Sequence, residues 1–266
     1  MIENERIIVS MTSYPKRITN VAKAIYFLMT KQTLKPDEIH LWLSTEEFPN
    51  KEKDLPQDLQ RILEVDAAII HWLPKNTYVH KRHEYFKIAH ENDLVFLIDD
   101  DVRYDDNLIE TVVNTHKKFD SCIICYNRYP EHIYKGKKII YGPSIAETVP
   151  LVNKNRWCGQ SMIPAKLYPK ECLSEEYQTI RDKVDPISDE CWFQPWTVYN
   201  DIPILHLNYG WGKDLDKNNS KWQGIVSWSH QVEANGLERR DNWLYGVLSS
   251  IPKLLDKYKR LFNYGN

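Results

Sequence analysis

The stretch from Leu94 to Ile98 is an unbroken apolar run, and it leads directly into Asp99, Asp100 and Asp101. Such a run is typical of a strand that is buried on both faces, as in a parallel sheet. Ligands of open α/β sheets bind at the carboxyl ends of these strands. Two carboxylates ~5 Å apart repel each other by roughly 3 kcal/mol at an effective dielectric of 20. A divalent cation would relieve this repulsion, and an all-oxygen site favours Mg²⁺ or Mn²⁺.

Strand and helix patterns alternate through the first half of the chain. This β-α-β order predicts an α/β fold with a mostly parallel sheet and helices on both of its faces. After residue 121 the predicted strands are short, which is typical of a mixed sheet, and no linker separates the two halves. The sequence therefore predicts one domain over residues 1–266, made of a first half, 1–120, and a smaller mixed second half, 121–266. We predict strands at residues 6–11, 38–44, 67–73, 94–98, 139–141 and 202–207, and helices at 18–29, 55–63, 85–91 and 107–119.

Composition and charge exclude several classes of protein. The formal net charge is −2, which is no basis for binding nucleic acid. No apolar run approaches the ~20 residues of a membrane span. The acidic start, Met1 to Arg6, is unlike a signal peptide, so we expect a cytoplasmic protein. Residues 121–126 (SCIICY) also have the pattern of a strand. Cys122 and Cys125 lie three positions apart in it, so they should point to opposite faces, and we predict reduced thiols.

A polar segment, Thr12 to Arg17, follows the first predicted strand. The first strand end of a doubly wound sheet is a nucleotide-binding position. The segment has neither G-x-G-x-x-G nor G-x-x-x-x-G-K-[ST], which argues against a dinucleotide dehydrogenase and a P-loop NTPase. The hydroxyls of Thr12 and Ser13 and the ring of Tyr14 could hold a nucleotide base instead. The alternative is that these residues cap the helix that begins near Ile18.

The order of these motifs resembles that of GT-A (Rossmann-like) glycosyltransferases. The βαβ start, the polar first loop and the buried strand ending in Asp99–Asp101 carry the resemblance, together with two later segments. Residues 157–164 (WCGQSMIP) resemble the glycine-containing segment that shapes the acceptor side. Residues 188–192 (SDECW) resemble the later acidic motif. The resemblance covers residues 6–200 and is greatest to bacterial enzymes that build cell-surface polysaccharides.

The resemblance implies a metal-dependent glycosyltransferase that uses a nucleoside-diphospho-sugar, with a UDP-sugar favoured. The first half would bind the donor, and Mn²⁺ or Mg²⁺ would bridge its phosphates. Asp99 and Asp101 should share one side of the strand and hold the metal, with His230 completing its shell and His206 as a second candidate. Lys81 resembles a basic donor contact, with Arg82 as a substitute and an exposed basic pair as the alternative for both. The candidates for donor binding are Thr12, Ser13, Tyr14, Arg17, Lys81, Asp99 and Asp100.

In the acceptor half, the resemblance implies an inverting displacement. Asp189 would deprotonate the acceptor hydroxyl, and Glu190 could take this role if the register differs by one residue. Glu190 stands where a second Asp is more usual. The alternative for Asp189 is a helix N-cap after Pro186. The candidates for acceptor binding are Trp157, Gly159 and Trp192.

The last predicted helix has its apolar residues on one face and lysines and arginine off it, over residues 251–262. It either docks on the domain or lies on the inner membrane surface, where lipid-linked acceptors occur.

Two functions other than that of a glycosyltransferase stay open for this chain. A sugar nucleotidyltransferase would carry a Gly-rich basic loop that residues 12–17 lack. A non-catalytic carbohydrate-binding protein would suit the nine Trp residues, but it would leave the three aspartates without a role.

Overall fold

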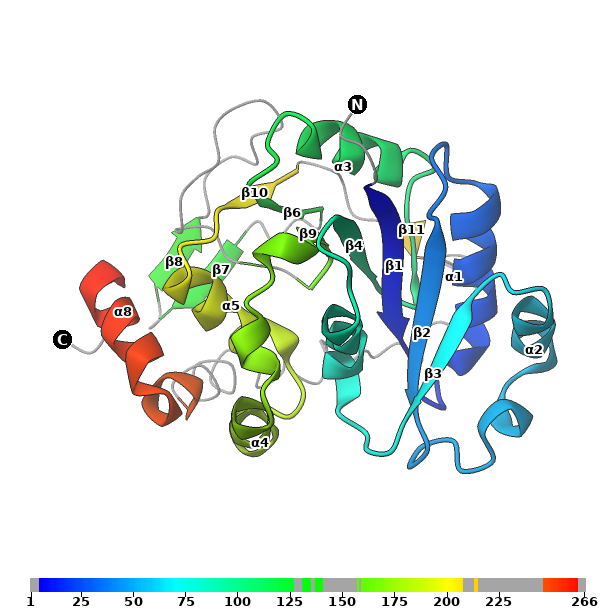
Figure 1. Cartoon of the computed structure of the whole chain (residues 1–266), viewed down its shortest axis with the longest axis horizontal. Coiled ribbons are helices and arrows are strands. Elements are labelled where there is room, and N and C mark those ends of the chain that lie inside the picture. Colours follow the sequence, from blue (N-terminus) through cyan, green and yellow to red (C-terminus); the bar gives the residue numbers. More distant parts are fainter. Residues whose placement is uncertain are drawn as a thin grey trace.

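The computed structural model describes residues 5–126, 131–134, 137–140, 157, 159–207, 213–214 and 246–262. A seven-stranded sheet with the order β10-β6-β9-β4-β1-β2-β3 runs through its centre (Figure 1). The strands β4, β1, β2 and β3 are parallel, and β10 is parallel to β6, whereas β9 is antiparallel to both of its neighbours. The strands are β1 (Arg6–Thr12), β2 (Glu38–Ser44), β3 (Ile69–Leu73), β4 (Asp93–Ile98), β6 (Ile123–Cys125), β9 (Ser161–Pro164) and β10 (Ile204–His206).

Helices cover both faces of this sheet, and two short antiparallel pairs lie outside it. β5 (Val102–Arg103) pairs with β11 (Lys213–Asp214), and β7 (Glu131–Tyr134) pairs with β8 (Lys137–Ile140). The α-helices are α1 (Ile18–Thr30), α2 (Gln57–Glu64), α3 (Leu108–His116), α4 (Glu175–Val184), α5 (Asp189–Tyr199) and α8 (Pro252–Phe262). The 3₁₀ helices are η1 (Lys51–Asp54), η2 (Tyr78–Lys87), η3 (Ala165–Leu167) and η4 (Lys170–Leu173).

The central strands are buried on both faces, which explains their continuous apolar sequence. Phe96 of β4 belongs to the core formed with α1, α2 and α3, whereas Val95 and Leu97 belong to the core formed with η2, α5 and α8. All three side chains are fully buried. Burying one such side chain stabilises the fold by about 1.5–3 kcal/mol. The strand that carries the three aspartates is therefore held rigidly from both sides.

The sheet confirms the predicted α/β class and the four predicted strands of the first half. Two elements near β4 differ in bounds or were not predicted. The helix that includes residues 85–87 is the 3₁₀ helix η2, which begins at Tyr78 and ends at Lys87, earlier than the predicted end at residue 91. The strand β9 was not predicted, because its sequence, SMIP, is too short for a clear period, yet it lies between β4 and β6. The sheet is thus mostly parallel with one antiparallel strand inside it.

The two cysteines of the C-x-x-C segment lie on opposite faces of the sheet, as predicted. Cys122 belongs to the core on the α1 face and Cys125 to the core on the α5 face. Both are free thiols, and so are the buried Cys172 and Cys191.

The C-terminal helix α8 docks on α5 through its apolar face (Figure 1). Leu254 and Tyr258 are buried in the core on that side, and Lys257 pairs with Asp201 at 2.6 Å. The apolar face of α8, which would have to contact the lipid if this helix lay on a membrane, is therefore buried against the rest of the chain.

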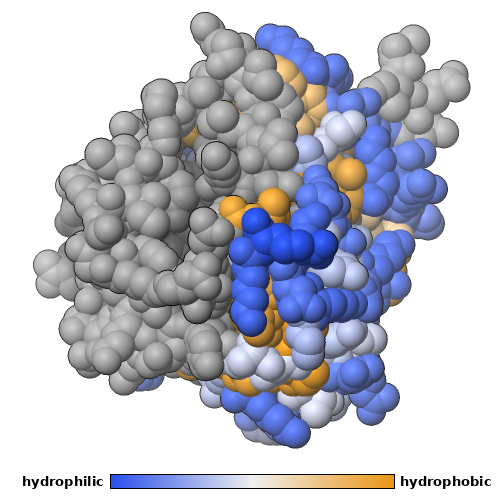
Figure 2. Space-filling model, turned by 90° about the vertical axis from the view of Figure 1, so that its left-hand side faces the viewer, coloured by the Kyte–Doolittle hydropathy of each residue, from blue (hydrophilic) through white to orange (hydrophobic). Residues whose placement is uncertain are grey.

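Among the described residues, no helix combines the length and the apolar composition needed to cross a bilayer. On the face shown in Figure 2, the described side chains are mainly hydrophilic, with smaller apolar groups between them.

Lys253 anchors the start of α8 in a cage of three aromatic rings. Its Nζ lies 5.0 Å from the ring centre of Tyr177, 4.9 Å from that of Trp196 and 5.0 Å from that of Tyr199, and it also pairs with Glu171. A cation over an aromatic face gains about 0.5–1 kcal/mol at exposed sites and more when it is desolvated.

Lys253→Gln should therefore lower the free energy of unfolding by about 1–2 kcal/mol and speed amide hydrogen exchange over residues 252–262. Lys259→Gln, at an exposed position of the same helix, is the matched control and should change neither quantity appreciably. Equal exchange of the two variants would show that the aromatic cage does not hold α8.

Candidate active site

The acidic turn after β4 contains two carboxylates that share one arginine. Arg17 Nη2 lies 2.5 Å from Asp101 Oδ1 and also pairs with Asp100 Oδ1. Ser13 Oγ donates a hydrogen bond of 2.5 Å to Asp100 Oδ2. Burial and the neighbouring carboxylates raise the pKa of Asp101 to about 7, against the lowering effect of Arg17. The side chains of the first loop and of the β4 end therefore meet, as the parallel sheet requires.

Asp99 and Asp101, which we predicted on one side of the strand, contact different arginines. Asp100 and Asp101 share Arg17, whereas Asp99 binds Arg82 and Gln160. The alternation of side chains holds only inside a strand. Because β4 ends at Ile98, Asp100 and Asp101 already belong to a turn.

Arg82 joins the two acidic segments of the chain. Its Nη1 donates to Asp99 Oδ1 at 2.7 Å, while its Nη2 and Nε donate to Asp189 Oδ2 at 2.6 and 3.0 Å. Ser10 Oγ of β1 donates to the Arg82 carbonyl at 2.7 Å and holds η2 against the sheet. Only 3% of Arg82 is exposed. One guanidinium thus spans the end of β4 and the start of α5.

Asp189 is a buried carboxylate that is held in its ionised form. Besides the two contacts from Arg82, its Oδ2 lies 3.1 Å from His83 Nε2, and His83 Nδ1 lies 3.1 Å from the Tyr168 hydroxyl. The charge of Arg82 and the contact with His83 keep the pKa of Asp189 well below its usual range, although burial acts in the opposite direction. The N-cap of α5 is Ser188, so the N-cap interpretation of Asp189 is wrong.

Gly159 makes the approach of Arg82 possible. A Cβ added at this position would lie 2.4 Å from Arg82 Nη2 and 3.5 Å from Asp189 Oδ1. No side chain fits there unless the guanidinium moves, because real Cβ atoms do not come this close to another heavy atom. Gly159, which we predicted on the acceptor side, therefore lies against the ion pair of Arg82 and Asp189.

Lys81 is buried beside the site but does not contact the three aspartates. Its Nζ donates to Glu47 Oε2 at 2.6 Å and to Asn76 Oδ1 at 2.8 Å. Burial lowers its pKa, while Glu47 opposes this shift. The exposed-pair interpretation of Lys81 and Arg82 is wrong for both residues, because both are buried. Arg82, which we considered only as a substitute, is the residue that binds the acidic segments.

The other predicted residues of the first loop are close to the acidic turn or to β2. Thr12 Oγ1 donates to the Trp42 carbonyl at 2.7 Å, and the ring centre of Tyr14 lies 5.8 Å from Arg17 Cζ. Neither Thr12 nor Ser13 caps α1, whose N-cap is Arg17 without a side-chain hydrogen bond. The helix-capping interpretation of this loop is therefore wrong.

The two predicted acceptor tryptophans lie in the core. Trp157 is fully buried, donates from Nε1 to Ser161 Oγ at 3.0 Å and packs edge-to-face on Phe193. Trp192 is buried in the same core. This burial argues against an acceptor platform made of these two rings.

Two histidines were considered as metal ligands. His230 lies outside the described residues, and the side chain of His206 is not described.

The charges of the site suit one divalent cation. The four carboxylates of Asp99, Asp100, Asp101 and Asp189 face two guanidiniums, those of Arg17 and Arg82. When all four carboxylates are ionised, two negative charges are left, and carboxylate oxygens are the ligands that Mg²⁺ and Mn²⁺ prefer. The donor chemistry therefore fits. In the described ranges, however, no three acidic, histidine or cysteine side chains converge as a ready metal shell.

Sequence reasoning missed a second buried acid, Asp185, which precedes α5. It is fully buried, its Oδ1 accepts from the Ser188 amide at 3.0 Å, and its Oδ2 has no hydrogen-bond partner among the described residues. Burial, with Asp189 and Glu190 nearby, raises its pKa to about 8. His80 Nε2 forms a hydrogen bond with the Asp185 carbonyl. Burial lowers the pKa of His80 to about 3, so His80 is neutral at the pH values where Asp185 titrates.

The raised pKa of Asp185 makes folding favour its protonated form. The unfolded chain loses this proton near pH 4, whereas the folded chain keeps it until about pH 8. The contribution of Asp185 to stability therefore falls as pH rises through this window, by at most about 1.4 kcal/mol per pH unit.

Asp185→Asn removes this dependence. The free energy of unfolding of the variant minus that of the unchanged chain should therefore increase as pH rises from 5 to 8.5. Urea unfolding at several pH values measures this difference. Asp66→Asn, at an exposed position, is the control and should give a constant difference. A constant difference for Asp185→Asn as well would contradict the raised pKa.

Comparisons with known proteins agree on the fold. No protein-family model matches the chain, and no curated protein matches its sequence. Among solved structures, residues 1–349 of TarS from S. aureus in complex with UDP are 11% identical, with a TM-score of 0.51, over 98% of this chain and 73% of that one. A mannosyltransferase, PcManGT from Pyrobaculum calidifontis, in complex with GDP-Man and Mn²⁺, is 14% identical with a TM-score of 0.49, over 98% and 76%. Glucosyl-3-phosphoglycerate synthase from Mycobacterium tuberculosis, in complex with Mn²⁺, UDP-glucose and phosphoglyceric acid, is 14% identical with a TM-score of 0.45, over 89% and 80%.

The likeness to TarS shows the fold of this chain. The sheet and its flanking helices form a GT-A-type fold. This confirms the fold class that the sequence motifs predict.

Proposed function

We propose that this chain is a metal-dependent glycosyltransferase that uses a nucleoside-diphospho-sugar. One observation carries the proposal: the carboxylates at the end of β4 and Asp189 of α5 meet through Arg82, on a GT-A-type fold. The presence of UDP in the TarS structure supports a UDP-sugar as the favoured donor. Following the resemblance of its motifs, we propose a glycan or lipid-linked hydroxyl as the acceptor and a cytoplasmic location.

The residues of the acidic turn would bind the diphosphate end of the donor. A divalent cation held by Asp101 and Asp99 would neutralise the charge of the leaving diphosphate. Ser13 donates a hydrogen bond to the neighbouring Asp100, which also pairs with Arg17. Thr12 at the end of β1 and Tyr14 in the loop that follows would contact the nucleotide. Lys81 donates to Glu47 and would support this side of the site.

Asp189 would act as the general base in a direct displacement that inverts the anomeric carbon. The acceptor oxygen attacks that carbon, the bond to the diphosphate breaks, and the hydroxyl proton passes to the carboxylate. Arg82 and His83 hold Oδ2, which leaves Oδ1, on the side of Gly159, for the hydroxyl. A carboxylate of low pKa is a weak base, so the proton would move late, when the new bond has made the hydroxyl acidic. Glu190, the next residue of α5, stays the alternative base.

Thermal unfolding with UDP-, GDP-, CMP- and dTDP-sugars, each with and without Mn²⁺, tests the proposal. A ligand present at a hundred times its Kd stabilises the folded state by about 2.7 kcal/mol. We expect a Mn²⁺-dependent shift with one nucleotide class, strongest with UDP. Asp101→Asn should lose the Mn²⁺-dependent part, and Asp66→Asn, its exposed control, should keep it. No shift with any donor would reject the transferase and favour glycan binding.

A further inference from the structure

Arg17 binds the acidic turn in an incomplete way. A guanidinium that pairs well with carboxylates uses two nitrogens in parallel. Here a single nitrogen, Nη2, serves both Asp100 and Asp101. The Nε of Arg17 is buried and has no hydrogen-bond partner among the described residues. A buried donor without a partner is costly, so this pairing does not use the full capacity of the guanidinium.

One of these oxygens is also one that a metal would need. Arg17 Nη2 pairs with Asp101 Oδ1 at 2.5 Å. A divalent cation on this oxygen would lie next to the guanidinium and be repelled by it. Metal binding to Asp101 therefore requires the guanidinium to move.

The guanidinium has another place to go. The backbone of Arg17 is fixed, because its amide and that of Ile18 both donate to the Tyr14 carbonyl at 2.9 Å. The long side chain is not fixed in this way, and its Cζ already lies over the half-buried Tyr14 ring at 5.8 Å from the ring centre. This contact can persist after the guanidinium leaves the carboxylates and would keep the positive charge stabilised.

We propose that Arg17 is an internal counter-ion that competes with the divalent cation for Asp101. Without metal, Arg17 holds the acidic turn together. When metal binds, the guanidinium leaves the carboxylates, so Arg17 sets the metal affinity of the free protein. The inference rests on the proposed function in one respect, namely that Asp101 is a ligand of Mn²⁺.

Mn²⁺ binding to the full chain without nucleotide tests this competition, and the electron paramagnetic resonance signal of free Mn²⁺ measures it. Arg17→Gln should bind Mn²⁺ about tenfold more tightly than the unchanged chain, within the usual range of coupling between binding events. Lys16→Gln removes the same charge from an exposed position of the same loop and should leave the affinity unchanged. In thermal unfolding without metal, Arg17→Gln should melt lower, and Mn²⁺ should raise its melting temperature more than that of the unchanged chain.

Two results would overturn the inference. One is a folded Arg17→Gln variant whose Mn²⁺ affinity equals or falls below that of the unchanged chain. The other is the absence of Mn²⁺ binding in all three proteins. A UDP-sugar that still stabilises these samples without Mn²⁺ would then show that only the metal argument fails, and that nucleotide-sugar binding stands.

A second measurement covers the case in which Arg17→Gln does not fold. The Nε–H signal of Arg17 in the nuclear magnetic resonance spectrum of the unchanged chain can be identified by its loss in Arg17→Lys. This signal should shift as diamagnetic Mg²⁺ saturates the protein. A signal that stays fixed while Mg²⁺ binds would overturn the competition.

Discussion

Arg82→Met will lower the free energy of unfolding by about 3–5 kcal/mol, the usual effect of removing one partner from a buried ion pair. The cause is the fate of Asp189, which is only 4% exposed and would remain as a buried charge without its guanidinium. Asp99 would lose the same partner, but its side chain is 30% exposed and keeps its contact with Gln160. Urea unfolding at neutral pH measures the change.

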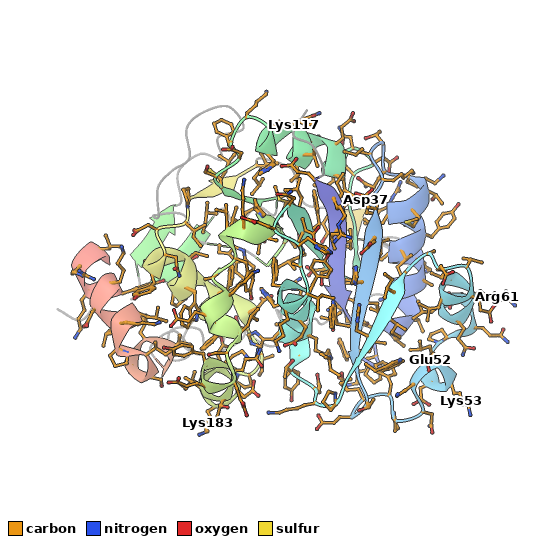
Figure 3. All side chains as sticks on the ribbon, viewed as in Figure 1. Asp37, Glu52, Lys53, Arg61, Lys117 and Lys183 are labelled. Atoms are coloured by element: carbon orange, nitrogen blue, oxygen red, sulfur yellow. The ribbon has the colours of Figure 1, made fainter. Side chains whose placement is uncertain are left out.

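Arg61→Met is the matched control for this measurement. Arg61 projects from α2 at the periphery of the molecule (Figure 3), so its replacement should change the free energy of unfolding by no more than about 0.5 kcal/mol. Arg82→Lys should recover only part of the stability, because a lysine cannot span two carboxylates as a planar fork does. A loss below about 1 kcal/mol for Arg82→Met would mean that the bridge between the two acidic segments is not needed for folding.

Asp189→Asn will lower the rate constant of sugar transfer by about 10²–10⁴-fold, the usual contribution of a general base. The amide keeps an oxygen that can accept from Arg82, so the fold should survive, but it cannot take the acceptor proton. The rate is measured with the donor that the thermal unfolding panel identifies. Unfolding of the variant in urea verifies that it is folded.

Glu190→Gln separates the two candidate bases. If Asp189 is the base, the loss of rate in Glu190→Gln will be much smaller than in Asp189→Asn. The opposite order would assign the base to Glu190. Glu176→Gln, an exposed residue of α4, controls for the loss of one acidic side chain from this half of the chain and should transfer at the normal rate.

Only part of the candidate site could be predicted from the sequence. The end of β4 was predictable, because an apolar run followed by acidic residues already indicates where a buried strand reaches the surface. The role of Arg82 was not predictable from its neighbours in sequence. It is 17 positions from Asp99 and 107 from Asp189, and only the packing of η2 and α5 on the sheet brings the three together.

The burial of Trp157 and Trp192 could not be predicted from the sequence either. A Trp-rich segment is compatible with both a sugar platform and a core, and the sequence contains no local signal that separates them. The insertion of β9 between β4 and β6 decides the question, because it draws Trp157 into the core beside Phe193. The role of Gly159 could not be predicted for the same reason. The absence of a side chain at this position matters only because the folded structure places Arg82 against it.

The sequence by itself determined the periodic elements of the first half, their parallel order and the three aspartates at the end of a buried strand. These features depend on hydrophobic patterns within about ten residues, where chain connectivity already fixes which side chains are neighbours. The tertiary structure alone decided which charge compensates which carboxylate: Arg17 with Asp100 and Asp101, and Arg82 with Asp99 and Asp189. Electrostatic pairing depends on distances between segments far apart in the chain, and these distances exist only after the cores on both faces of the sheet have formed.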